Sequence, residues 1–138
     1  MTDPRYTKLA RLLVEYSTAL RKGDHVLLDM IEVPDEFTVA LIRAVRAVGA
    51  TPLVEVRHGR VTREVLRQTN EKHASLIRDL ELHRMKRMQA YIAIRGSHNA
   101  NETSDVASDR MALYSRVIRP VLNYRVNKTR WVMPTRQL

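Results

Sequence analysis

Few residues in this chain have the types and spacing that metal chemistry needs. His73 and His83 lie ten residues apart in one charge-rich stretch, and there is no HExxH motif and no histidine pair at zinc spacing with a carboxylate. We expect both to be solvated, and His25, which opens a predicted strand, to be structural. His98 is the one histidine in a predicted ligand loop, although a surface position is the default for it too. The sequence therefore predicts no metal site in this chain.

Motifs for nucleophilic attack and for phosphate binding are also missing. Ser97 and Ser104 lie near His98, but neither serine sits in a GxSxG elbow. The chain has no GxGxxG and no GxxxxGK(S/T) motif, and the acidic turn at 32–35 disfavours phosphate. We predict that the chain holds no catalytic residue and is inactive by itself.

One polar loop is well placed for a ligand. Residues 95–105 directly follow a predicted buried strand, and open α/β sheets bind ligands beyond the carboxyl ends of their strands. We predict a ligand-binding or interdomain loop that comprises Arg95, Ser97, His98, Asn99, Asn101 and Glu102. Arg95, Ser97 and Asn99 would be its hydrogen-bond donors toward a small polar or anionic ligand.

The charge balance raises the question of an acidic partner. The formal net charge is +9, and Arg78, Arg84, Lys86 and Arg87 cluster in one predicted helix. Aromatic residues make up only 5% of the chain, so no stacking platform for nucleic acid is visible. Neighbouring acids allow ordinary pairs along a solvated helix. We rank a solvated surface first, a protein interface second and nucleic acid third.

The elements that must position these residues alternate between strands and helices. An apolar run at 26–31 predicts a strand buried on both faces, and Pro34 ends it. A helix follows that carries acidic residues in its first turn and ends at Gly49, and a second strand spans 51–57. Two strands joined by such a helix form a right-handed crossover and pair in parallel.

The rest of the chain continues this alternation. We predict a first helix, Pro4–Leu20, with a buried stripe of Leu9, Leu12, Leu13, Tyr16 and Leu20. The other predicted elements are a turn at 58–60, a short helix at 61–68 with Thr62 as N-cap, a helix at 70–89, a strand at 91–94, a helix at 108–121 that ends near Pro120, and a strand at 130–133. We therefore expect a three-layer, Rossmann-like α/β domain over residues 1–138, with a small, mostly parallel four-stranded sheet in the order 2-1-3-4.

Composition bounds the class of protein. A length of 138 residues fits one domain, and 44% hydrophobic residues can supply a core. The absence of cysteine excludes disulfides and thiolate metal sites and fits a reducing compartment. We see no signal peptide and no apolar run long enough to span a membrane, so we expect a cytoplasmic protein without a membrane partner.

Several segments, taken in order, resemble one known family. These are 20–28 with its Lys22-Gly23-Asp24 turn, Glu36-Phe37, the Gly49-Ala50-Thr51-Pro52 segment, the strand and polar loop from Ile92 to Val106, and Arg130-Trp131-Val132. Together they are similar to the amino-terminal part of the thermophilic-type metallo-aminopeptidases, the relatives of aminopeptidase S, aminopeptidase T and the PepS enzymes. The resemblance covers most of the chain, from Tyr6 to Val132.

The resemblance implies an amino-terminal domain whose catalytic domain is missing. Family enzymes are homodimers that remove amino-terminal residues from peptides with two divalent metal ions, Zn, Co or Mn, held by residues of the later domain. No catalytic or metal-binding residue carries over to this chain, so we expect it to bind no cofactor. Its expected role is to shape the active-site cavity and to support the dimer, with a peptide as substrate of the full-length enzyme only.

Two departures from the family pattern lie near the end of the chain. The family's usual arginine, aromatic and Pro-Thr-Pro segment after the tryptophan is replaced by a short tail, and Ala107 stands where proline is common. We expect Arg130, Trp131, Val132 and Met133 to form an interface toward the missing domain and to promote self-association. The alternative function is a stand-alone binding module for a small anionic ligand or for nucleic acid.

Overall fold

A four-stranded parallel sheet forms the middle layer of the protein. The computed structural model describes residues 3–96 and 106–134. The strands, in the order β2-β1-β3-β4, are β1 (His25–Ile31), β2 (Thr51–Arg57), β3 (Ala90–Arg95) and β4 (Arg130–Val132). All three strand pairs are parallel. The three-layer, Rossmann-like α/β class and the order 2-1-3-4 predicted from the sequence are thereby confirmed.

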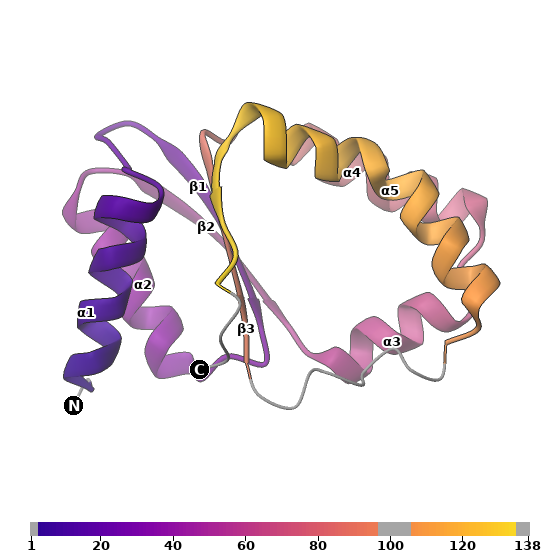
Figure 1. Ribbon diagram of the computed structural model, residues 1–138, viewed down its shortest axis with the longest axis horizontal. Coiled ribbons are helices and arrows are strands. Elements are labelled where there is room, and N and C mark those ends of the chain that lie inside the picture. Colours follow the sequence, from indigo (N-terminus) through magenta and orange to yellow (C-terminus); the bar gives the residue numbers. More distant parts are fainter. Residues whose placement is uncertain (1–2, 97–105, 135–138) are drawn as a thin grey trace.

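Helices cover both faces of the sheet. The helical elements are α1 (Pro4–Leu12), the π-helix η1 (Leu13–Ser17), α2 (Asp35–Ala47), α3 (Gly59–Arg67), α4 (Glu71–Met85) and α5 (Ser108–Lys128). Figure 1 shows α1 and α2 on one side of the strands and α4 and α5 on the other. The central strands β1 and β3 are buried on both faces, which is why their sequences are almost continuously apolar.

The core on the α1–α2 side is built mainly from apolar side chains. Phe37 is fully buried at the start of α2 and meets the Tyr6 ring edge to face, with ring centroids 5.4 Å apart. Every second residue of the central strands, including Leu28 and Ile92, packs into this cluster. The turn after α2 uses Gly49 with φ of 81°, a left-handed conformation that glycine adopts without strain.

The first helix differs from its prediction. It ends at Leu12, and the chain continues as one π-helical turn in which the Thr18 hydroxyl donates to the Leu13 carbonyl at 2.9 Å. Leu13 and Leu20 of the expected stripe are buried and Leu9 packs partly buried against the core, as predicted. Ala10 and Val14 are fully buried in addition. Leu12 and Tyr16 are exposed, and placing these two in the core was wrong.

Two later helices also differ from their predictions. The short helix begins at Gly59 with His58 as N-cap residue, so the predicted turn at 58–60 and the Thr62 cap were wrong. The last helix continues through Pro120 to Lys128. Proline removes one intrahelical hydrogen bond, but the residues around it, Val117, Ile118 and Val121, are buried, and this burial favours continuation.

None of the helices within residues 3–96 and 106–134 combines the length and the apolar character that a membrane crossing requires.

Candidate functional site

The carboxyl edge of the sheet is where the sequence placed a ligand loop. Arg95 is the last residue of β3 and is exposed, and the Gly96 N–H donates to the Ile31 carbonyl at 2.7 Å. A Cβ on Gly96 would lie 1.6 Å from the Glu32 carbonyl oxygen, so the close approach of these two chain segments requires glycine. The other predicted members, Ser97, His98, Asn99, Asn101 and Glu102, lie outside the described residues.

The Glu32 carboxylate occupies the N-terminus of α3 at this edge of the sheet. Glu32, which adopts a left-handed φ of 54°, accepts the Gly59 N–H at 2.7 Å and lies 3.8 Å from His58 Nδ1. A helix N-terminus attracts negative charge, and here the Glu32 carboxylate supplies it. The N-terminus of α3 is therefore filled from within the chain.

The most developed polar arrangement lies on the α4–α5 side of the sheet. Seven side chains form a closed circuit of contacts, which we call the charged ring: Asp29, Glu55, Arg57, Glu81, Arg84, Tyr91 and Arg125. They come from β1, β2, α4, β3 and α5, so the ring connects three strands with both helices of this layer.

The geometry of the ring can be followed from β1. Asp29 Oδ1 lies 3.0 Å from Arg57 Nε, which is 3.3 Å from Glu55 Oε1. Arg84 then bridges Glu55 and Glu81 through its two terminal nitrogens.

The circuit closes through α5. Arg125 contacts the second oxygen of Glu81 at 3.1 Å and lies over the Tyr91 ring, 4.3 Å from its centroid. The Tyr91 hydroxyl donates to Asp29 Oδ2 at 2.7 Å.

The electrostatics of the ring favour the charged forms of Glu55, Arg57 and Arg84. Burial acts to raise the pKa of Glu55, but the hydrogen bond from Arg84 and the charges of Arg57 and Arg125 lower that pKa overall. Burial opposes the charge on Arg57 and Arg84, yet the neighbouring acids raise the pKa of both. Burial and then the charge of Asp29 raise the pKa of the Tyr91 hydroxyl.

Divalent metal ions do not fit the described side chains. No group of three or more histidine, aspartate or glutamate side chains among residues 3–96 and 106–134 could hold a metal ion. The acids of the ring, Asp29, Glu55 and Glu81, each pair with arginine, so their oxygens are already engaged by cations. The ring is a structural arrangement of charges, and we derive no metal chemistry from it.

The arginine-rich helix is only partly the solvated surface that we ranked first. Lys86 and Arg87 are exposed, but Arg84 turns inward to the charged ring.

The sequence analysis did not identify the charged ring, because its paired side chains are far apart along the chain. The available signal was charge inside otherwise apolar strands, at Asp29 in β1 and at Glu55 in β2.

Three of the described histidines lie on two elements, His25 at the start of β1 and His73 and His83 on α4. His25 donates its backbone N–H to Gln89 Oε1 at 2.7 Å, and its Nδ1 lies 3.1 Å from the Arg87 carbonyl oxygen, which ties the start of β1 to the segment before β3. His83 is exposed on α4, and His73 is half-buried near its start.

The four residues of the predicted interface alternate between contacts within the protein, made by Arg130 and Val132, and exposure, at Trp131 and Met133. Arg130 forms an ion pair with Asp24 and donates from Nε to the Thr18 carbonyl at 2.7 Å, while Val132 packs against the α1–α2 core. Trp131 pairs with Tyr91 in the sheet register and therefore faces the α5 side. Trp131 and Met133 are exposed by 45% and 38%.

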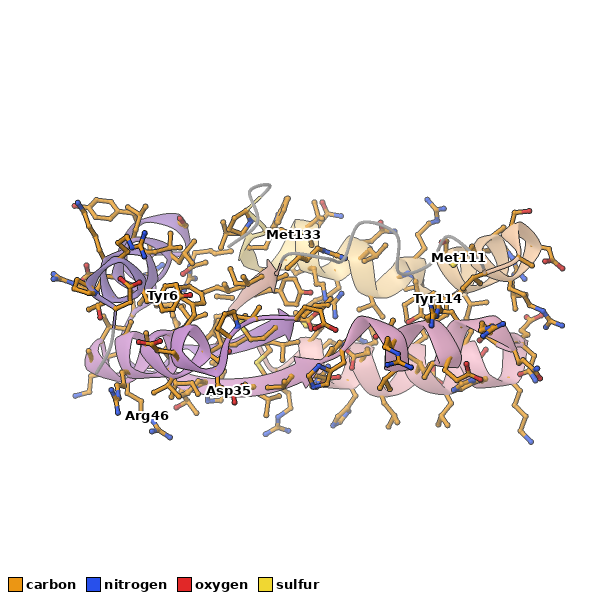
Figure 2. The ribbon with its side chains drawn as sticks, turned by 90° about the horizontal axis from the view of Figure 1, so that it is seen from below. Tyr6, Asp35, Arg46, Met111, Tyr114 and Met133 are labelled. Atoms are coloured by element: carbon orange, nitrogen blue, oxygen red, sulfur yellow. The ribbon has the colours of Figure 1, made fainter. Side chains whose placement is uncertain are left out.

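Helix α5, which leads into β4, also carries exposed apolar side chains. Leu122 and Val126, in its last two turns, are exposed as well, and β4 is an edge strand. We call Leu122, Val126, Trp131 and Met133 the β4-edge surface. Met133 lies along the side of the molecule that carries α5, away from Arg46 of α2 (Figure 2).

Comparison with solved structures supports the fold. The chain is similar to wild-type AmpT from Thermus thermophilus, with 18% identity and a TM-score of 0.70 over 93% of this chain. It spans 34% of that chain's length. A second similar structure is a putative transcription regulation repressor of the LacI family from Corynebacterium glutamicum, with 13% identity and a TM-score of 0.47 over 93% of this chain and 40% of that one. No curated protein matches the sequence.

The family comparison covers nearly the whole chain. The pattern of the thermophilic metalloprotease family, M29, matches residues 2–133, from before α1 to just beyond β4. The resemblance to metallo-aminopeptidases that the sequence segments indicated is thereby confirmed. This chain belongs to the thermophilic metalloprotease family M29.

Proposed function

We propose that this chain is the amino-terminal, non-catalytic domain of a metal-dependent aminopeptidase. The observation that carries the proposal is the family match over residues 2–133, together with a chain that spans only 34% of the length of AmpT. The peptide-hydrolysing residues and their divalent metal ions, Zn, Co or Mn, would belong to a further domain. In that enzyme the metals would polarise the peptide carbonyl and supply a hydroxide nucleophile.

The role of this domain would be structural. The β4-edge surface offers exposed apolar side chains beside a strand edge that no strand of the described residues pairs, and such surfaces favour burial against a partner. We propose that a further domain covers this surface, and that the domain helps to shape the active-site cavity and to support a homodimer in the cytoplasm. We propose that the polar loop from Arg95 to Glu102 is a ligand-binding or interdomain element.

An activity measurement tests the assignment of the chemistry. We expect no hydrolysis of amino-terminal residues by the 138-residue chain with added Co²⁺, Zn²⁺ or Mn²⁺, and metal-dependent hydrolysis by a longer M29 enzyme assayed in parallel. Metal-dependent turnover by the 138-residue chain would contradict the proposal, and histidines such as His58 and His98 would then be replaced one at a time.

A second measurement tests the interface. Light scattering of the chain at rising concentration should show self-association, which the replacement Trp131→Glu should weaken because it places a charge in the β4-edge surface. The matched control is Val39→Glu, which changes an exposed valine on α2. Equal self-association of the two variants would show that the β4-edge surface is not the interface.

A further inference from the structure

The charged ring connects the α4–α5 layer to the sheet through ionic contacts. Arg84 joins α4 to Glu55 on β2, Arg125 joins α5 to Tyr91 on β3, and Glu81 joins the two helices. With three carboxylates and three guanidiniums, the ring is neutral as long as its acids are ionised. The layer is thus held by contacts whose strength depends on the charge of its acids, in addition to its apolar contacts.

Acid removes only the negative half of this arrangement. Arginine stays charged at every pH at which a protein is folded, so protonation of Asp29, Glu55 and Glu81 leaves three guanidiniums close together and partly buried. Like charges in such a place repel one another and lack counter-charges. The helices that carry two of these guanidiniums, Arg84 on α4 and Arg125 on α5, are then pushed away from the sheet.

The opposite layer has no described acid within its cluster of buried apolar residues, and its Arg130–Asp24 ion pair joins β4 to the turn before β1 rather than α1 or α2 to the sheet. The side chains that β1 and β3 direct toward α1 and α2 are all apolar: Val26, Leu28, Met30, Ala90, Ile92 and Ile94. Their burial does not change with protonation. One sheet therefore carries a layer that acid should loosen and a layer that it should leave in place.

We propose that the charged ring is an acid-sensitive latch, which releases α4 and α5 from the sheet while α1 and α2 stay packed on the other face. This inference does not depend on the proposed function. It rests on the closed circuit of contacts and on the contrast between the two faces.

The other charged and titratable groups near the latch do not replace it. Tyr114 faces the ring, but tyrosine, including the ring member Tyr91, is neutral throughout the acid range. Glu71 and Arg116 link the two helices at 3.9 Å, but both side chains are mostly exposed, so this pair holds the layer weakly. Arg110 donates to the Thr69 carbonyl at 2.6 Å, a bond that contains no acidic group.

Hydrogen exchange at graded pH tests the latch in the 138-residue chain. With rates corrected for the intrinsic effect of pH, we expect amides of α4 and α5 to lose protection as pH falls from about 5 to about 3, by about tenfold per pH unit for each proton bound on opening. Amides of α2 and of the centre of β1 should keep their protection against exchange over the same pH range. Loss of protection in all elements at the same pH would overturn the proposal.

A matched pair of substitutions separates the latch from general acid sensitivity. Glu55→Gln removes one acid of the ring, so the α4–α5 amides should already be at least about tenfold less protected at neutral pH. The slope of their protection against pH should then correspond to about one proton fewer bound on opening. Glu15→Gln removes an exposed acid on the α1 side and should match the unaltered chain. Equal exchange profiles for the two variants would refute the latch.

A second readout in the unaltered chain keeps the test independent of how the variants fold. Trp131 is the only tryptophan, and it follows α5 directly in β4. Its fluorescence should change over the same pH range in which α5 loses protection, before the circular dichroism of the remaining helices is lost. A fluorescence change that coincides with complete unfolding would contradict the latch.

Discussion

The two faces of the sheet are built by opposite means from the same strands. Toward α1 and α2, β1 presents Val26, Leu28 and Met30 to an apolar cluster. Toward α4 and α5, the same strand presents Leu27 and the almost fully buried Asp29, which is 5% exposed. The packing of α1 and α2 on the central strands therefore rests mainly on burial of apolar side chains, whereas the packing of α4 and α5 also depends on paired charges.

This difference shows that a strand can be buried on both faces and still carry a charged side chain. A buried strand tolerates a carboxylate when neighbouring elements supply its partners, as Arg57 and Tyr91 do for Asp29. Such pairing does not guarantee more stability than an apolar core would provide. It makes the packing of α4 and α5 depend on specific partners and on pH.

The largest effect is expected on the apolar face. Phe37→Ala would leave a cavity beneath α1 and α2, because the ring is fully buried and contacts Tyr6. We expect a loss of about 3–5 kcal/mol in the free energy of unfolding, with little dependence on pH. Urea unfolding at several pH values measures both quantities. A cost below about 1 kcal/mol would show that this face is not the main apolar core.

The next effect is expected from breaking the charged ring at its most buried acid. Asp29→Ala leaves Arg57 without one of its two acids and the Tyr91 hydroxyl without its acceptor. We expect a loss of about 2–3 kcal/mol, less than for a fully buried pair because Arg57 is partly exposed. The double variant Asp29→Ala, Tyr91→Phe should cost less than the sum of the single variants. Strict additivity would show that the two side chains do not act together.

A smaller effect with a distinctive pH dependence is expected for Tyr91→Phe. Loss of the hydrogen bond to Asp29 should cost about 1 kcal/mol. Burial and the nearby Asp29 charge raise the pKa of Tyr91 in the folded state, so the folded chain keeps a proton that the unfolded chain loses above about pH 10. Stability of the unaltered chain should therefore fall as pH rises above that value.

The Tyr91→Phe variant is also the control for the loss of stability at alkaline pH. Unfolding free energies at about pH 9 and about pH 11 should differ less in Tyr91→Phe than in the unaltered chain, because one of the tyrosines with a raised pKa is gone. An unchanged difference would assign the alkaline loss to other groups.

The smallest effect is expected for an ion pair outside the ring. Arg11 and Glu15 lie 3.7 Å apart on the α1 side, and both side chains are well exposed. Glu15→Gln should change the free energy of unfolding by no more than about 0.5 kcal/mol. A change as large as that of Asp29→Ala would mean that the contrast between the two faces does not rest on burial of charge.

Much of the fold could be predicted because its signals are local. The apolar runs of β1 and β3, the acidic start of α2 and the glycine after it identify the βαβ unit from neighbouring residues alone. Helix details were less predictable. The π-helical turn after Leu12 and the passage of α5 through Pro120 depend on which side chains the rest of the protein buries.

The candidate site was less accessible to sequence analysis. The residues that resemble the family could be recognised in order along the chain, and the family match confirms them over residues 2–133. The charged ring could not be predicted, because Glu55 and Arg84 are 29 positions apart and Asp29 and Tyr91 are 62 positions apart.

The sequence by itself determined the order of elements, the parallel sheet and the family, since periodic burial and short turns are encoded by adjacent residues. Only the tertiary structure decided which charges meet. Parallel register brings Glu55 beside Asp29 and Asp29 beside Ala93, and the packing of α4 and α5 then adds Arg84 and Arg125. A side chain's charge is a property of its residue type, but its partner is a property of the folded chain.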